Sequence, residues 1–219
     1  MPTRLLVIGN KRYSSWSLRA WIGLKQLGLP FQERRISLYA PGYKEQLAPL
    51  SPSGKVPVLT DDGVTVHDSL AILEYLNETY AQGAWLPKAP KARALARSVS
   101  AEMHAGFQNM RQHLNMNLGR APKPTTPDEA ARADVNRVLA IWEGCRREHE
   151  GEGPWLFGAW GIADAMYLPV AARFHHWAVD LSAHPRAQAY GKALYALPAF
   201  QEWKADALKE TDLLPQFEK

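Results

Sequence analysis

The pattern of apolar and polar positions predicts an α/β unit in the first part of the chain. The unbroken apolar run Leu5–Ile8 is typical of a strand that is covered on both faces. Between Trp16 and Leu27 the apolar residues recur at helical spacing, and Gly28 and Pro30 end that helix. Further strands are predicted over Phe31–Leu38, Val56–Leu59 and Val64–Val66, and further helices over Tyr43–Leu47 and from Asp68 to Tyr80.

The rest of the chain is predicted to be all-helical. Glycines and prolines interrupt the periodicity at residues 82–90, so we place a linker there between an α/β domain at 1–81 and a helical domain at 91–219. Apolar residues step by three or four from Leu95 to Leu118, which predicts one long helix. Further helix starts are predicted at the capping box Thr126–Glu129, with Pro127 at the first helical position, and at Pro185 and Pro198.

Composition and charge narrow the classes of function. Hydrophobic residues at 46% and charged residues at 22% are ordinary for a soluble globular protein. No apolar run reaches the length of a membrane span, and the apolar part of the N-terminus is too short for a secretory signal. The single cysteine, Cys145, excludes an intrachain disulfide and suits a reducing cytoplasm.

The net charge is positive, which raises the question of nucleic-acid binding. The formal charge is +4 and the pI is about 9.2, but the basic residues are scattered and interleaved with acids. This distribution favours a solvated surface with a mild preference for anionic small molecules. The neighbouring residues His175 and His176 would point in different directions on a helix, so we expect no metal site there.

Pro57 interrupts a predicted strand and cannot donate a hydrogen bond to a ladder. Two interpretations are open. Pro57 can simply end an edge strand, or the interrupted strand can lie beside the helix N-terminus at Asp68-Ser69 and bind an extended peptide that ends in a carboxylate.

The order strand, proline, strand, Asp-Ser, helix resembles the thioredoxin-like domain of glutathione transferases over about the first eighty residues, and more weakly beyond. The resemblance is to bacterial-looking members of the serine-type zeta, tau and theta classes. It implies a cis Val56-Pro57 bond. It also implies a glutathione site in which Val56 pairs its backbone with the tripeptide, Lys55 meets the glycine carboxylate, Ser69 and the helix amides hold the γ-glutamyl carboxylate, and Asp68 lies near the ammonium.

A thioredoxin-like domain that exchanges disulfides needs a thiolate at the start of its first helix, usually in a C-x-x-C pair. This chain has Ser14-Ser15-Trp16-Ser17 there, so the thiol must come from the ligand. A serine hydroxyl can donate to the glutathione sulfur and favour thiolate. Ser14 stands five residues before Arg19, as the catalytic serine does in the family, but Ser15 stays a candidate and plain helix capping stays an alternative.

The region from Trp155 to Trp177 is similar to the folding motif of the transferase helical domain. In the family a serine or threonine caps this helix and an aspartate three residues later closes the box. Here Gly161 takes the cap position and Asp164 can still bond to the cap amide, at a cost of a few tenths of a kcal/mol relative to serine. Pro169 predicts a kink in the same helix.

The resemblance implies a second-substrate pocket over Ser14, and our candidates for its wall are Trp16, Met103, Phe107 and Met110. A stripe of this kind at helical spacing can also be core. We therefore expect a two-domain glutathione transferase that conjugates the thiolate to a small hydrophobic electrophile, as a cytoplasmic homodimer without metal, nucleic acid or membrane partners. Two alternatives are open: a glutathione-dependent cis-trans isomerase of the maleylacetoacetate isomerase type, and a non-catalytic glutathione transferase-like interaction protein.

Overall fold

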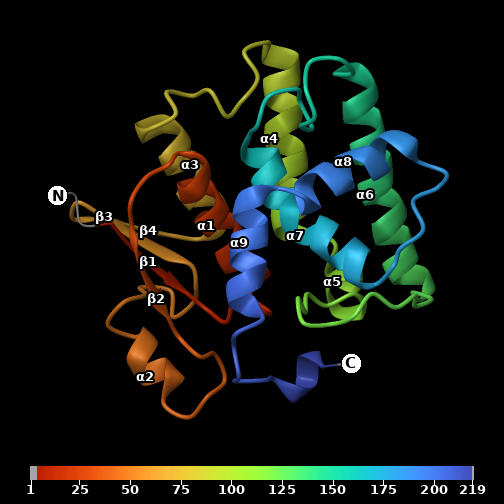
Figure 1. The fold of residues 1–219 in the computed structure, drawn as a ribbon. Coiled ribbons are helices and arrows are strands. Elements are labelled where there is room, and N and C mark those ends of the chain that lie inside the picture. The colour runs from red at the N-terminus through yellow and green to blue at the C-terminus, as the bar shows by residue number, and fades with distance from the viewer. Residues whose placement is uncertain (1–3, 219) are drawn as a thin grey trace.

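The structure is a computed structural model that describes residues 4–218. Its N-terminal part contains a mixed sheet (Figure 1). Its strands are β1 (Arg4–Ile8), β2 (Gln32–Arg35), β3 (Val58–Asp61) and β4 (Val64–His67). They lie in the order β2-β1-β3-β4, with β1 parallel to β2 and antiparallel to β3, and β3 antiparallel to β4. All four predicted strands are confirmed; β2 is shorter than predicted, β3 starts two residues later, and β1 and β4 each extend by one residue.

The two inner strands explain the apolar runs in the sequence. Leu6, Val7 and Ile8 of β1 are buried, as expected for a strand covered on both faces. In β3, Leu59 lies opposite Leu6 on one side and Val66 on the other. Because β3 is an inner strand, the interpretation of Pro57 as the end of an edge strand is wrong. The proline precedes β3 and leaves Val56 outside the ladder.

Helices cover both faces of the sheet. Helices α1 (Ser15–Gln26) and α3 (Ser69–Thr79) pack between the sheet and the helical region, whereas α2 (Tyr43–Leu47) lies on the opposite side (Figure 1). The side with α2 is closed by a small apolar cluster, and the side with α1 and α3 belongs to the main core that continues into the helical region. The main core therefore joins one face of the sheet to the helical region.

The helical region consists of α4 (Pro90–Ala105), α5 (Gln108–His113), α6 (Glu129–Glu148), α7 (Ile162–His176), α8 (Pro185–Tyr195) and α9 (Pro198–Ala207), followed by a 3-10 turn at Pro215–Phe217. The central helix α7 packs against α1, α4 and α8. Its Tyr167 ring is perpendicular to the Trp142 ring, and so is the ring of Tyr190 in α8. The predicted fold class, a thioredoxin-like domain followed by an all-helical region, is confirmed.

The prediction of one long helix from Leu95 to Leu118 is wrong, because the chain turns at Gly106 and Phe107. Phe107 has a left-handed φ of 61°, and α5 starts only after it. Arg111 folds back and donates from Nε to the Gly106 carbonyl at 3.0 Å and from Nη2 to the Met103 carbonyl. These bonds satisfy carbonyls that the end of α4 leaves without a helical partner.

The helix starts are mostly as predicted. Pro185 and Pro198 begin α8 and α9, but α6 starts at Glu129 with Asp128, not Thr126, as its N-cap, since Asp128 Oδ1 accepts from Ala131 N–H at 2.7 Å. Asp128 lies closer to the apolar run than Thr126 and caps the helix in its place, so Pro127 lies before the helix. Helix α7 continues through Pro169.

The Gly161 cap and the Asp164 side chain form the predicted box. Gly161 N–H donates to Asp164 Oδ2 at 2.8 Å, and Leu156 N–H and Tyr190 O–H both donate to Oδ1 at 2.9 Å. A Cβ at Gly161 would lie 2.5 Å from the Trp85 carbonyl oxygen. The backbone of Trp85 approaches too closely for the serine or threonine of the family motif, so glycine is needed here.

Candidate active site

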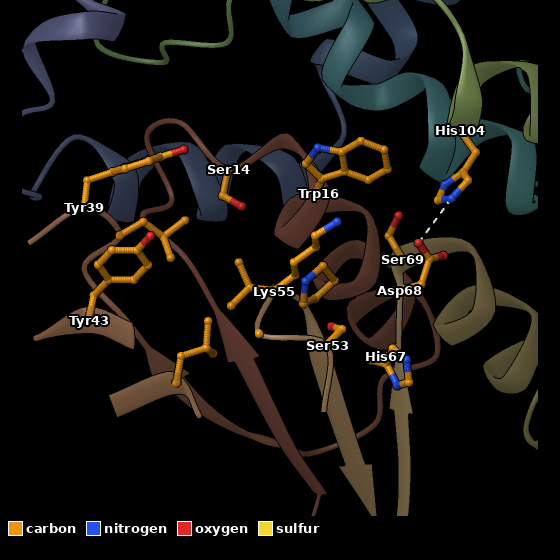
Figure 2. A pocket seen from close by; sticks show the side chains of 15 residues that line it. Ser14, Trp16, Tyr39, Tyr43, Ser53, Lys55, His67, Asp68, Ser69 and His104 are labelled. Carbon is orange, nitrogen blue, oxygen red and sulfur yellow. Dashed lines mark ion pairs between the residues drawn. The ribbon is translucent and has the colours of Figure 1, made fainter. Parts of the chain in front are cut away.

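A cavity of about 620 Å³ lies where the loops of the sheet face α4 (Figure 2). It brings together residues that are far apart in the sequence and that come from the start of α1, the loop before β3 and the start of α3. The predicted site residues on its wall are Ser14, Trp16, Lys55, Val56, Pro57, Asp68 and Ser69. Seven of the predicted site residues therefore lie around the same cavity.

The Val56-Pro57 bond is cis, as the family resemblance implied. Within residues 4–218, neither the N–H nor the C=O of Val56 has a hydrogen-bond partner. The loop is held from below by the buried Ser51, whose hydroxyl donates to the Lys55 carbonyl at 2.7 Å and accepts from the Lys55 N–H at 3.0 Å. The Val56 backbone groups are thus fixed in position and free to pair with an extended ligand.

The start of α3 forms another wall of the cavity. Asp68 is the N-cap, and its Oδ1 accepts from Leu70 N–H at 2.9 Å and Ala71 N–H at 3.3 Å. Ser69 is buried, and its Oγ has no hydrogen-bond partner among the described residues. A buried hydroxyl without a partner at a helix N-terminus suits a ligand carboxylate, because donor groups and the helix dipole both favour negative charge there.

Ser14 is both a cap and a cavity residue. Its Oγ accepts from Ser17 N–H at 3.3 Å at the start of α1 and donates to Ser17 Oγ at 2.8 Å. Ser15 lies elsewhere: its Oγ accepts from Arg173 Nη2 at 3.3 Å, and it does not line the first cavity. The structure therefore separates the two serines that the sequence left as alternatives.

A second cavity of about 300 Å³ adjoins the first, and Ser14 and Trp16 line both. The Trp16 ring has the Arg19 guanidinium carbon 4.6 Å and the Arg111 guanidinium carbon 5.0 Å from its centroid. The chain after α4 contributes four polar residues to this second space, Gln108, Arg111, Asn115 and Arg173, together with Met116, Leu214 and Phe217.

The structure corrects the predicted wall of the second-substrate pocket. Met103, Phe107 and Met110 are buried in the core and line neither cavity, whereas Trp16 does. The stripe faces inward because α4 and α5 use it to pack on their neighbours, and the break at Phe107 turns Arg111 toward Trp16 instead.

Three arginines around Trp16 give this part of the site a strong positive charge. Arg19 and Arg173 are buried, and within residues 4–218 none of Arg19, Arg111 and Arg173 pairs with a carboxylate. Arg19 Nη1 and Nη2 also lack any hydrogen-bond partner there. Burial lowers the pKa of Arg173 to about 9, with a further contribution from Arg111, and burial lowers the pKa of Arg19 and of Arg111. Desolvated cations of this kind attract anions.

Several residues that line the two cavities were not predicted from the sequence. Tyr39, Tyr43, His67 and His104 line the first cavity, and Arg111 and Arg173 line the second. The only signal was Arg173, a charged residue in the otherwise apolar run of α7, since charge inside an apolar helix usually has a specific role. The described residues contain no cluster of three or more His, Cys, Asp or Glu side chains that could hold a metal, and no helix among them is long and apolar enough to cross a membrane.

Comparison with known proteins agrees with this geometry. Residues 13–79 match the model of the glutathione S-transferase N-terminal domain. Maleylacetoacetate isomerase from Rattus norvegicus is 32% identical over 193 residues, which cover 85% of each chain. A glutathione transferase homolog from Burkholderia, solved with bound glutathione, superposes with a TM-score of 0.68 at 26% identity and covers 94% of this chain and 97% of that chain.

A third match is maleylacetoacetate isomerase from Anaeromyxobacter dehalogenans, solved with dicarboxyethyl glutathione and citrate in its active site. Its TM-score is 0.66 at 28% identity, over 95% of this chain and 97% of that chain. The fold and the open cradle beside Ser14 define a glutathione-dependent enzyme. The chain belongs to the glutathione S-transferase family.

Proposed function

We propose that this enzyme is a glutathione-dependent cis-trans isomerase of a small acid that carries a cis double bond next to a carbonyl group. Glutathione occupies the first cavity. Its glycine carboxylate meets Lys55, its cysteinyl backbone pairs with Val56, and its γ-glutamyl head lies at Asp68 and Ser69. The Ser14 hydroxyl donates to the sulfur and stabilises the thiolate.

The reaction needs no net consumption of glutathione. The thiolate adds to one carbon of the double bond, and the bond's electron pair moves to the carbonyl oxygen as an enolate. The former double bond is then a single bond and rotates. Return of the electron pair re-forms the double bond in the trans geometry and expels the thiolate. Positive charge beside the cavity stabilises the enolate and the substrate carboxylates.

The observation that carries this proposal is the group of arginines without carboxylate partners next to Ser14. Arg111 and Arg173 line the second cavity. Arg111 Nε and Nη2 and both Nη atoms of Arg173 already bond within the chain, so these residues act on a bound acid mainly through their positive charge. The names of the relatives agree, because maleylacetoacetate is an acid with a cis double bond and the bacterial isomerase was solved with carboxylate-rich molecules. The same arginines make a purely hydrophobic electrophile, our first expectation, a poorer fit.

The test is incubation of the enzyme with maleylacetoacetate and a small amount of glutathione, with the isomers separated chromatographically and free thiol counted. Isomerisation predicts many turnovers per glutathione and a constant thiol count. Conjugation predicts thiol loss in proportion to product. Thiol loss with an aryl halide and no isomerisation would return the assignment to a conjugating transferase.

A non-catalytic interaction protein is the remaining alternative, and the intact cradle with Ser14, Val56 and Ser69 argues against it. Retention on immobilised glutathione with release by free glutathione separates the two.

The family resemblance also implies a cytoplasmic homodimer, which we keep as part of the proposal. Sedimentation of the purified chain would test the dimer.

A further inference from the structure

His104 is the side chain that the helical region sends into the first cavity. It stands in the last turn of α4 and points toward the start of α3, where its Nε2 lies 3.1 Å from Asp68 Oδ2 (Figure 2). Its ring meets the Trp16 ring edge to face, with the centroids 5.3 Å apart. The contact therefore joins the two parts of the protein at the wall of the cavity.

Asp68 uses its two carboxylate oxygens differently. Oδ1 caps α3 through the amides of Leu70 and Ala71, and Oδ2 faces His104. The residue has a φ of 79°, outside the common range for a residue with a side chain. The cap and the histidine contact together fix the direction of the second oxygen, which lies at the edge of the cavity.

Two polar atoms beside this carboxylate lack partners. His104 Nδ1 and Ser69 Oγ are both buried and have no hydrogen bond to any residue from 4 to 218. Leaving such atoms without partners costs free energy, and when both belong to one cavity wall a ligand group can supply the missing bonds.

We propose that His104 is a glutathione-binding residue, and that with Asp68 and Ser69 it recognises the γ-glutamyl head. The proposal rests on the glutathione site described above. The head carries a carboxylate and an ammonium group next to each other. The Ser69 hydroxyl and the positive end of the α3 dipole receive the carboxylate, and Asp68 attracts the ammonium but repels the carboxylate. The His104 Nε2–H donates to Asp68 Oδ2 and so reduces that repulsion, and Nδ1 is then an acceptor that can receive a hydrogen bond from the ammonium.

The test is calorimetric binding to the full chain of two ligands that differ only in the head: glutathione, and cysteinylglycine, which lacks the γ-glutamyl group. We expect His104→Ala to weaken glutathione binding about ten-fold, as for the loss of one hydrogen bond to a charged group, and to leave cysteinylglycine binding unchanged. His104→Gln keeps an N–H near the Nε2 position and should recover part of the affinity.

His113→Ala is the matched control. His113 Nδ1 lies 3.4 Å from Oδ2 of Asp128, the N-cap of α6, so it repeats the pairing of a histidine with a capping aspartate, but it does not line the cavity. This variant should bind both ligands as the wild type does.

Unchanged glutathione affinity in His104→Ala, or equal losses for both ligands, would overturn the assignment. A folded wild-type chain that binds no glutathione would overturn it together with the proposed site. A chain that binds glutathione but isomerises no acid would overturn the proposed reaction alone, since this test reads binding and not turnover.

Discussion

The Ser14 hydroxyl donates a hydrogen bond to Ser17 Oγ over 2.8 Å, and Ser17 Oγ also accepts from the Gly9 N–H at 3.0 Å. A serine hydroxyl has a single proton. Ser14 can therefore donate to a glutathione sulfur only by giving up its bond to Ser17, and Ser17 keeps its bond to Gly9 when it does. The bond holds Ser14 Oγ at the cavity wall, so that only the hydroxyl proton has to turn from Ser17 toward the sulfur.

Replacing Ser14 should affect turnover and stability separately. We expect Ser14→Ala to lower kcat/KM about ten-fold, the value of one hydrogen bond to a charged group. Loss of the α1 cap should lower the free energy of unfolding by about 1 kcal/mol. Ser15→Ala should instead change the KM of the second substrate, since Ser15 lines only the second cavity. Equal rates for wild type and Ser14→Ala would remove Ser14 from the chemistry.

Replacing Arg111 should discriminate between charged and neutral substrates. We expect Arg111→Gln to lower kcat/KM for a dicarboxylic substrate about ten-fold or more, and to change the rate with a neutral aryl halide little. Arg137→Gln is the control, because Arg137 is an exposed arginine that pairs with Glu102 outside both cavities. A similar loss with both substrates would mean that Arg111 acts only by holding the end of α4.

Gly161 should not tolerate the residue that the family motif prefers. Serine is a better cap than glycine on propensity, but its Cβ would lie 2.5 Å from the Trp85 carbonyl oxygen. We expect Gly161→Ser to lower the free energy of unfolding by about 1–3 kcal/mol in urea titration, as overpacking does. Gly144→Ala, inside α6 with open space around it, should instead stabilise by up to about 1 kcal/mol. Stabilisation by Gly161→Ser would contradict the packing.

His176 should make the fold sensitive to acid. Its Nδ1 contacts the Arg120 carbonyl, its Nε2 lies 3.3 Å from the Tyr195 hydroxyl, and Lys204 Nζ donates to that hydroxyl at 2.8 Å. Burial lowers the pKa of His176 from 6.5 to about 4, although the Arg120 carbonyl opposes the shift.

Between these two values the unfolded chain binds the extra proton and the folded chain does not, so stability must fall as the pH drops through that window. The full effect is about 3 kcal/mol. In His176→Asn, urea titrations at several pH values should show a weaker loss on acidification than in the wild type. Parallel losses in the two chains would assign the acid sensitivity to other groups.

The local sequence determined much of the fold and of the glutathione cradle. Each strand, the cap at Asp68 and the box at Gly161 and Asp164 depend on neighbouring residues, and sequence spacing is enough to find them. Ser14, Lys55 and Ser69 could be matched to one cavity because the family pattern fixes their order along the chain.

The second pocket could not be predicted because it depends on how the chain turns after α4. The periodicity does not reveal that Phe107 adopts a left-handed φ, or that Arg111 then folds back onto the helix end. Met103 and Met110 therefore belong to the core, and the pocket wall comes from arginines that lie far apart in sequence. His104 was missed for the same reason, since its partner Asp68 lies in the other part of the protein.

A pH titration of the thiolate absorbance of glutathione bound at saturation, in the wild type and in Ser14→Ala, tests whether Ser14 activates the ligand sulfur. Activation of a ligand sulfur by Ser14 predicts that the bound thiol of the wild type ionises about one pH unit or more below free glutathione in the same buffer, equal to about 1.4 kcal/mol. The shift should be largely lost in Ser14→Ala. A bound thiol that titrates like free glutathione, or an equal shift in both chains, would show that Ser14 does not activate the sulfur.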